Sequence, residues 1–263
     1  QRIRADILAL VGSTVRPRSI DGDVTVLVPT SPIPAHPDTA VIEETVVSVR
    51  HHLPDAEILV MVDGVRPDME HRRADYEHYQ RRLLWLARHR WGRCTVLRHD
   101  DHQHQANMAR HALNLVTTPL VLYVEHDTPL VADEPIDWLG CALPIVTDEL
   151  DVVRFHYEAV IPEPHRYLML DDTPVDVAGC PVLRTRQFSA RPHLAATQWY
   201  RQALSDHFPA TCRTFIEDKL HSVCQAERWG RNRLAIYAPR PNLKRSLNLD
   251  GRQDDPKAGC VVE

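Results

Sequence analysis

The sequence PLVLYVEHDTPL, residues 119–130, indicates a strand that ends in two carboxylates. Residues 120–124 form a continuous apolar run of β-formers, which is typical of a strand buried on both faces of a mostly parallel sheet. Pro129 prevents a simple continuation of that strand. Because side chains two positions apart on an extended chain point the same way, Glu125 and Asp127 share one side. Ligands usually bind at this end of an open α/β sheet, where paired carboxylates favour a divalent cation, magnesium or manganese. The alternative is a strand that exits into a solvated acidic turn.

Strand and helix patterns alternate upstream of this stretch. Strands are predicted at residues 24–28, 57–62 and 94–97, and helices at residues 38–53, 67–89 and 107–113. This alternation predicts an α/β fold, a Rossmann-like sheet with helices on both faces and right-handed crossovers. Four prolines in residues 29–37 indicate a stiff loop after the first strand. The chain has neither GxGxxG nor GxxxxGKS, so a dinucleotide site or a P-loop is disfavoured.

The pattern loosens after Asp127. Strands are predicted at residues 151–157 and 234–237. Residues 181–188 follow a Pro- and Asp-rich passage, and residues 189–204 read as a loop that enters a helix. We expect an N-terminal extension over residues 1–22, with a short helix at 5–11, and a flexible tail over residues 250–263. Between them we expect two halves, residues 23–130 and residues 131–249.

Composition narrows the classes of function. The 263 residues carry a net charge of -5, which is not the footprint of a nucleic-acid binder, although Arg184, Arg186 and Arg191 allow a local phosphate-facing patch. No apolar run approaches the roughly 20 residues of a membrane span. The six cysteines form no CxxC pair and fit free thiols in a reducing compartment. We therefore expect a cytoplasmic protein, with Gln1 in place of Met allowing for a trimmed leader.

The segment HDDHQHQANMARH, residues 99–111, is rich in histidine. A zinc site is one interpretation, but His102 and His104 lack the i, i+4 spacing of HExxH. The second half of the segment has small and apolar residues at helical spacing. It predicts a helix packed below a ligand site, with Arg110 able to reach an anionic group.

Taken in order, these motifs resemble a family-2-type glycosyltransferase with the GT-A fold. The resemblance spans about residues 24–248. It implies that residues 23–130 form the donor-binding half and residues 131–249 the acceptor-binding and catalytic half. It rests on a strand leading into a loop at residues 24–31, a strand ending in Asp63, the Asn-x-Ala-Arg helix of residues 107–110, the DxD-like triplet of residues 125–127, and the Glu217-Asp218 pair that opens a helix.

The resemblance implies roles for particular residues. It implies a metal-dependent transfer of a sugar from a nucleoside-diphosphate sugar, UDP-linked by expectation, to an acceptor hydroxyl with inversion. Asp127 would hold manganese or magnesium, with Glu125 in place of the usual first Asp, and Asp218, beside Glu217, would be the catalytic base. The residues expected to bind the donor are Pro29, Thr30, Ser31, Asp63, Asn107, Arg110, Glu125, His126, Lys244 and Arg245.

The acceptor stays open at this level. Arg191, His193 and Trp199 are the candidate acceptor-binding residues, because Trp stacks on sugars or bases and the segment carries local charge. A glycan, a protein, a small molecule and a modified nucleobase all remain candidate acceptors. Competing functions are a nucleotidyltransferase, a non-catalytic sugar-nucleotide or glycan-binding module, and a zinc hydrolase built on residues 99–111.

Overall fold

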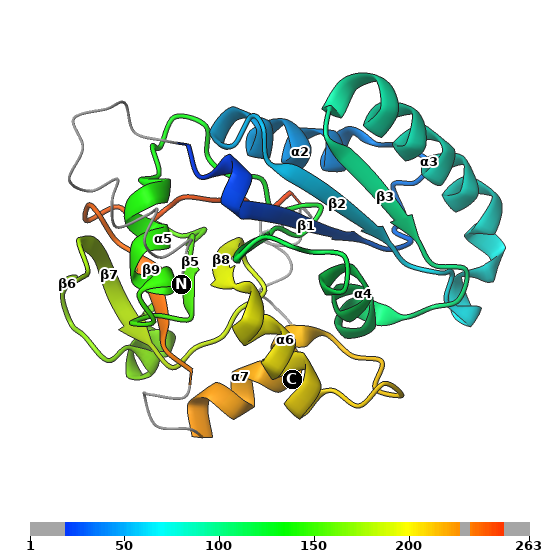
Figure 1. The fold of residues 1–263 in the computed structure, drawn as a ribbon. Helices are drawn as coiled ribbons and strands as arrows, with labels where there is room; N and C mark the ends of the chain where they lie inside the picture. Colours follow the sequence, from blue (N-terminus) through cyan, green and yellow to red (C-terminus); the bar gives the residue numbers. More distant parts are fainter. Residues whose placement is uncertain (1–18, 227–231, 250–263) are drawn as a thin grey trace.

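The computed structural model describes residues 19–226 and 232–249, which build one nine-stranded sheet covered by helices (Figure 1). The strands are β1 (Val24–Thr30), β2 (Glu57–Val62), β3 (Cys94–Arg98), β4 (Leu120–Tyr123), β5 (Val152–Arg154), β6 (Val175–Val177), β7 (Cys180–Thr185), β8 (His193–Ala196) and β9 (Leu234–Tyr237). The α-helices are α2 (Ala40–His52), α3 (Arg73–Leu86), α4 (His104–Leu113), α5 (Trp138–Val146), α6 (Thr197–His207) and α7 (Ile216–Ala226). The expected helix at residues 5–11 and the expected tail at 250–263 lie outside the described residues.

The strand order is β3-β2-β1-β4-β8-β5-β9-β7-β6. The first four of these strands pair in parallel, as the βαβ alternation predicts. Strand β8 then pairs antiparallel with both β4 and β5, β9 runs parallel to β5, and β7 and β6 complete an antiparallel edge. The predicted α/β fold is confirmed, and a single sheet runs through both residues 23–130 and residues 131–249.

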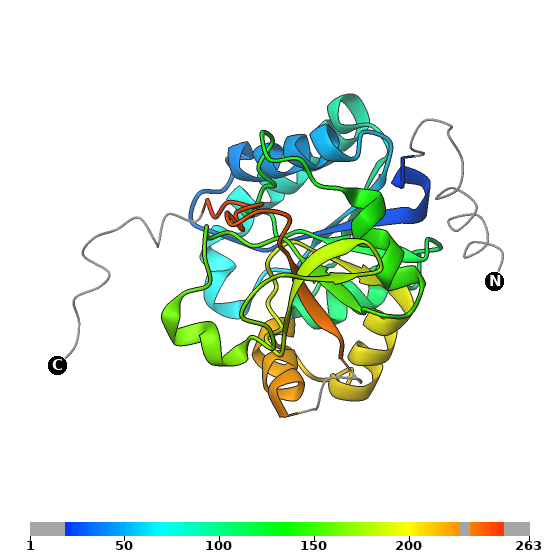
Figure 2. The same ribbon diagram turned by 90° about the vertical axis from the view of Figure 1, so that its left-hand side faces the viewer.

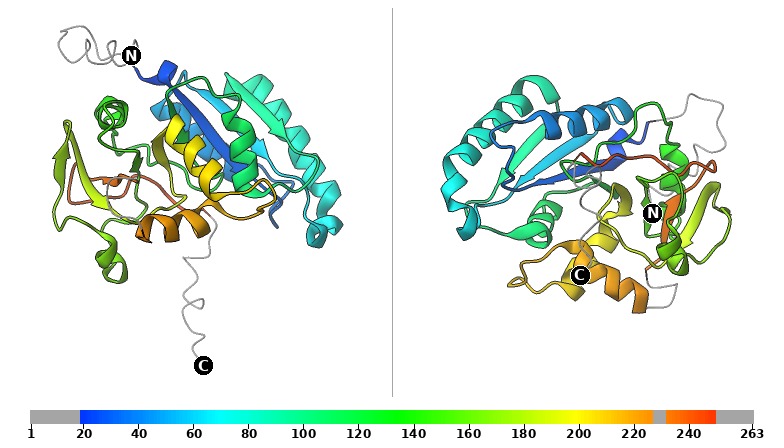
Figure 3. Two further views of the ribbon diagram at one scale, coloured as in Figure 1. Left: turned by 60° about the horizontal axis from the view of Figure 1, so that its bottom comes forward. Right: turned by 180° about the vertical axis from the view of Figure 1, so that it is seen from behind.

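The two faces of the sheet bury different helices. Because alternate side chains of a strand point to opposite faces, Val24, Val26 and Val28 pack with α2 and α3, whereas Leu27 packs with α4. Helices α6 and α7 cover the same face as α4, and α4 and α6 lie side by side across it (Figure 3). This helical layer ends near the C-terminal end of β4.

Two sequence predictions need correction. The first strand runs through Pro29 and Thr30, which were expected in a loop. Proline is tolerated there because pairing of β1 with β4 stops at Leu27, so no ladder bond to β4 is required of Pro29. Residues 193–196, predicted as loop, form the central strand β8.

The long helix predicted over residues 67–89 is three helical pieces, a 3-10 turn at Pro67–Arg72, α3, and a π turn at Ala87–Trp91. Five cysteines are free thiols, namely Cys94, Cys141, Cys180, Cys212 and Cys224, and Cys260 lies outside the described residues. Within residues 19–226 and 232–249, no helix has the length and apolarity to cross a bilayer.

Candidate active site

Two carboxylates mark the end of β4. The chain leaves the sheet after Val124, whose N–H donates to Leu27 O at 3.0 Å, and turns through residues 125–128 with Thr128 bonded back to Glu125 O. Glu125 and Asp127 are both half-buried in this turn. Burial, and next the neighbouring Asp127 charge, raise the pKa of Glu125 to about 7. The pair therefore resists carrying two negative charges without a cation.

Gln105 ties this turn to the helical layer. Its amide nitrogen donates to Glu125 Oε1 at 2.6 Å, while its amide oxygen faces the Ile216 N–H at 3.4 Å. The ring of His104 contacts Phe215 edge-on, 4.5 Å between centroids. The start of α4, the end of β4 and the start of α7 therefore meet at one place, where the N-terminal end of α7 also favours negative charge.

The acidic pair of α7 lies in this first turn. Glu217 Oε2 accepts hydrogen bonds from the Ala190 N–H at 2.8 Å and from Ser189 Oγ at 3.3 Å. Asp218 is exposed, and its side chain makes no hydrogen bond or ion pair within the described part of the chain. Glu217 is thus engaged with the loop before β8, whereas the Asp218 carboxylate is available to a ligand.

A row of side chains continues the site across the sheet. Tyr123, His193 and Arg154 are register partners in β4, β8 and β5, so they lie on one face. Tyr123 and His193 stack with their centroids 5.4 Å apart. Just beyond this row lies Arg191, whose positive charge acts on Glu125 and whose guanidinium sits 4.0 Å from the ring centroid of Tyr157.

Arg154 is a basic residue of this site that the sequence did not reveal. It is only 4% exposed, and burial lowers its pKa to about 10 although nearby Glu217 opposes that change. Its terminal nitrogens donate to Gln187, at 3.4 Å to the carbonyl and 3.1 Å to the side chain. Arg154 belongs to no motif, and one arginine in a three-residue apolar strand does not predict a binding site. The sequence alone therefore could not place Arg154 here.

The C-terminal segment 243–249 borders the same turn (Figure 2). Leu249 N–H donates to Asp127 O at 2.8 Å, and Leu130 bridges to Ser246. Lys244, which was predicted to bind the donor, is half-buried in this segment, and its backbone forms an isolated parallel β-bridge with that of His156. The segment therefore lies within reach of a ligand held at Asp127.

Several predicted residues are occupied inside the protein. Arg245 is 1% exposed and donates to the carbonyls of Asn242 and Lys244. Arg110 binds the carbonyls of Leu204 and Phe208, which fixes α6 against α4. These two arginines hold the scaffold of the site in the described structure.

Three further candidates are also bonded to other parts of the protein. Asn107 is buried and donates to Ala210 O at 3.1 Å. His193, predicted for the acceptor, is fully buried beneath the site and bonded to Arg191 O and the Tyr200 hydroxyl. Trp199 packs on Phe188 and donates to Asn232 at 3.0 Å.

Asp63 organises the loop before α4. Its carboxylate accepts hydrogen bonds from the N–H groups of Gly64 at 2.8 Å, Gln103 at 2.6 Å and His104 at 3.1 Å. It also lies 2.8 Å from His102 Nδ1. Asp63 therefore fixes the backbone of residues 102–104, and the adjoining Gln105 is held where it reaches Glu125.

The other donor candidates lie on the β1 side. Thr30 is buried and shares a hydrogen bond with the Tyr79 hydroxyl at 2.9 Å. Ser31 is half-exposed, and its backbone carbonyl accepts a hydrogen bond from His36 Nε2 at 3.0 Å. The His126 carbonyl accepts from Thr45 Oγ1 at 2.8 Å, which fixes the middle of the DxD-like turn.

The histidine-rich segment does not gather into a cluster. His99 pairs with His111, and His102 with His104, at centroid distances of 5.1 and 5.4 Å. No group of three or more His, Cys, Asp or Glu side chains suited to a metal ion occurs within residues 19–226 and 232–249. The expected patch of arginines is divided as well, because Arg184 is bound to Asp171 at 2.7 Å.

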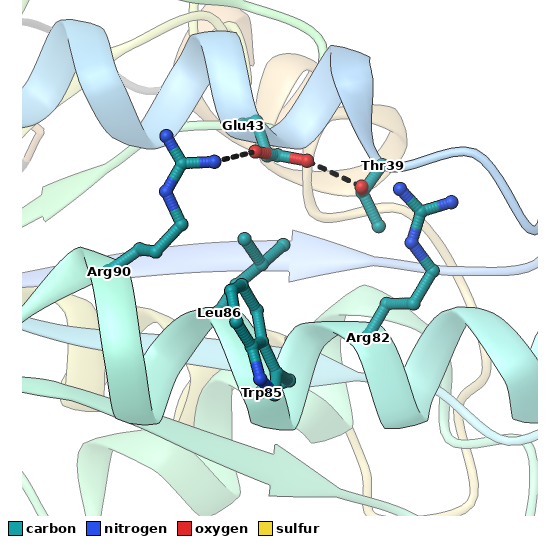
Figure 4. A pocket seen from close by; sticks show the side chains of 6 residues that line it. All are labelled: Thr39, Glu43, Arg82, Trp85, Leu86 and Arg90. Atoms are coloured by element: carbon teal, nitrogen blue, oxygen red, sulfur yellow. Dashed lines mark hydrogen bonds and ion pairs between the residues drawn. The ribbon is translucent and has the colours of Figure 1, made fainter.

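A separate hollow of about 180 Å³ lies between α2 and α3, away from these groups (Figure 4). Its lining includes Trp85 and the Glu43 carboxylate, which is paired with Arg90 at 3.6 Å and bonded by Thr39 at 2.5 Å. No predicted site residue lines it.

Comparison with known proteins gives the fold a name. No protein-family model matches the sequence, and no curated protein matches it. Among solved structures, TarS of S. aureus superposes with a TM-score of 0.51 at 15% identity over 90% of this chain and 38% of TarS. The chain has the GT-A fold.

Two further structures share it. TarS residues 1–349 in complex with UDP match with a TM-score of 0.51 at 14% identity, over 90% of this chain and 63% of that one. The mannosyltransferase PcManGT of Pyrobaculum calidifontis, in complex with GDP-Man and Mn2+, matches with a TM-score of 0.50 at 13% identity, over 91% and 64%. The chain thus spans less than two thirds of the length of each of these GT-A proteins.

Proposed function

We propose that this chain is a metal-dependent glycosyltransferase that moves a sugar from a nucleoside-diphosphate sugar, UDP-linked, to an acceptor hydroxyl with inversion. The observation that carries the proposal is the meeting of Glu125 and Asp127 with the acidic first turn of α7, on a GT-A fold. The UDP complex of TarS and the GDP-Man and Mn2+ complex of PcManGT support the donor class and the metal.

The residues at the end of β4 fit a divalent cation. Manganese and magnesium take oxygen ligands, and Asp127 offers a carboxylate without a hydrogen-bond partner among the described residues. Glu125, whose pKa is raised by burial and by Asp127, gains most from a nearby positive charge. In the proposed site Asp127 would hold the metal, and Glu125 would support it. The metal would neutralise charge that develops on the departing diphosphate.

The base is proposed to be Asp218. A hydroxyl is a weak nucleophile until a carboxylate takes its proton, and Asp218 is exposed with no hydrogen-bond partner among the described residues. Glu217 positions that turn through its hydrogen bonds to Ser189 and Ala190. A base on the face opposite the leaving group gives in-line displacement and therefore inversion.

The donor side is proposed to lie over β1 and β2, with Ser31 and His126 as the residues best placed for it. Lys244, whose backbone pairs with His156, would reach the diphosphate from the C-terminal segment. Pro29, Thr30 and Asp63 then support the nucleotide site from below, since their side chains are buried.

The test begins with donor binding. Thermal unfolding is measured with a panel of nucleoside diphosphates and nucleotide sugars, each with and without manganese or magnesium, because a ligand of the folded state raises its stability. We expect a metal-dependent rise with UDP that disappears in Asp127→Ala and persists in Asp133→Ala, an exposed acid in the same connection. No response to any nucleotide would remove the basis of the proposal.

The chemical step is tested separately. Asp218→Asn is expected to lose at least 100-fold in transfer, or in donor hydrolysis where no acceptor is supplied, while UDP binding is retained. Asp206→Asn, on the exposed side of α6, is the matched control. Retained turnover in Asp218→Asn would move the base elsewhere, and Glu217→Gln would then be the next variant to measure.

A further inference from the structure

Two arginines beside the carboxylates have no acidic partner. Within the described residues, neither Arg154 nor Arg191 has a carboxylate within 4.0 Å. Arg154 is 4% exposed, yet its Nε is a buried donor without an acceptor. A buried cation with an unmatched donor is costly, so it indicates a partner beyond the described residues.

The surroundings of these arginines add further unmatched polar groups. His156 is 5% exposed, and its ring nitrogens are buried without a hydrogen bond of ordinary geometry among the described residues, although the backbone of Val160 lies close enough to favour the protonated ring. Its Nε2 lies 3.4 Å from Glu158 Oε2. Burial, then the charges of Arg154 and Arg191, lower the pKa of His156 to about 3, so the ring is neutral and offers one N–H. This group of three residues is called the basic cluster below.

The basic cluster lies on the side of the carboxylates away from the proposed donor. In the sheet, β1 and β2 lie on one side of β4, and β8 and β5 on the other. With about 4.8 Å between strands, Arg154 on β5 is displaced roughly 10 Å from β4 in the direction away from β1. A nucleotide over β1 and β2 would therefore leave the basic cluster free for the second substrate.

We propose that Arg154 and Arg191 bind an anionic group, a phosphate or a carboxylate, carried by the acceptor. The claim that an anion binds here rests on the basic cluster alone. The claim that the acceptor carries this anion rests on the proposed function. Arg191, held flat against Tyr157, presents its guanidinium edge to two oxygens of the anion. Arg154 and the His156 ring supply further donors from below. Glu217, whose charge acts on Arg154, links this subsite to the turn that carries Asp218.

The experiment measures binding of glucose 6-phosphate, glucuronate and neutral glucose by calorimetry, with and without saturating UDP and magnesium. We expect both anions to bind at least 10-fold tighter than glucose, with UDP present or absent. Arg191→Gln should weaken the anions at least 10-fold and leave UDP binding within 2-fold. Arg186→Gln is the matched control, an exposed arginine five positions away. Arg154→Lys keeps the charge and loses the forked donor, and should weaken the anions to an intermediate degree.

Three outcomes would overturn the inference. Equal binding of glucose and the two anions removes the need for a cationic subsite. Displacement of the anions by UDP, or loss of UDP binding in Arg191→Gln, assigns the arginines to the donor diphosphate. If the wild-type protein binds no nucleotide, the glycosyltransferase proposal fails, and the comparison of anions with glucose still decides whether the basic cluster is an anion site.

Discussion

Substitution of Asp63 is expected to lower the stability of the protein more than substitution of most other polar residues. Its carboxylate, 1% exposed, accepts three backbone N–H groups and faces His102 Nδ1. Oδ1 serves Gly64 and Gln103, and Oδ2 serves His104. In Asp63→Asn one of these oxygens becomes an NH2 group, so at least one buried N–H faces a donor whichever way the amide is turned.

The magnitude follows from the number of bonds affected. A hydrogen bond to a charged acceptor contributes about 1.5–3 kcal/mol, and an unsatisfied buried donor costs about 1–3 kcal/mol. Losing one bond and weakening the others by removing the charge gives an expected loss of about 2–4 kcal/mol in the free energy of unfolding. The same change should loosen the turn before α4 and with it the Gln105 contact to Glu125.

The assay is urea unfolding at pH 7, with hydrogen exchange of the Gln103 and His104 amides as a local readout. Asp68→Asn is the control, because Asp68 is exposed and paired only loosely with Arg66 at 3.6 Å; it should change stability by less than about 0.5 kcal/mol. A loss below about 1 kcal/mol in Asp63→Asn, with unchanged exchange at the two amides, would refute the role of the carboxylate as anchor.

Three further predictions concern stability. A Cβ on Gly64 would lie 2.2 Å from the Asp101 carbonyl carbon, so Gly64→Ala should lower the melting temperature by several degrees in a thermal scan, at about 1–3 kcal/mol. Arg233 holds Asp151 at 2.8 Å with both side chains mostly buried, and Asp151→Asn should cost about 2 kcal/mol in urea unfolding. Burial lowers the pKa of His193 to about 4 from an ordinary 6.5. The contribution of the neutral His193 ring to the free energy of unfolding is therefore fully present above pH 6.5 and is lost as the pH falls toward 4. Stability measured at pH 8 and pH 5 should therefore differ by about 2 kcal/mol less in His193→Gln than in the wild type, and equal pH slopes would contradict this reasoning.

The parallel half of the fold was predictable because its signals are local. Residues 120–124 are apolar throughout, and the strand they predict is β4 with the carboxylates directly after it. The strand at residues 234–237 was predicted with its exact bounds. In these segments burial on both faces leaves a continuous apolar run, which a single sequence displays directly.

The antiparallel half was less predictable because its pairing is non-local. Strand β8 has four residues, begins with a histidine after a proline, and is specified by partners near residues 122 and 153. His193 was predicted to bind the acceptor, whereas in the fold its ring lies in the core and is bonded to Arg191 O and the Tyr200 hydroxyl. Gln105 and Arg154 carry no motif, and only the folded chain places them beside Glu125 and Glu217.

Strand β8 also sets how the molecule can deform. It is hydrogen-bonded along both edges, to β4 on one side and to β5 on the other, so the two substrate sides share an unbroken backbone ladder. Rotating one half against the other would shear both ladders at once, which excludes a hinge at this boundary as a cheap motion. Any closure over a bound ligand would therefore involve the connections at the rim, where residues 125–131 and 243–249 are joined to each other by a few main-chain bonds. The sheet therefore forms a continuous rigid unit, and the segments 125–131 and 243–249 are held by fewer bonds. Substitutions in these two segments should alter the rates of ligand entry and release more than the position of the carboxylates.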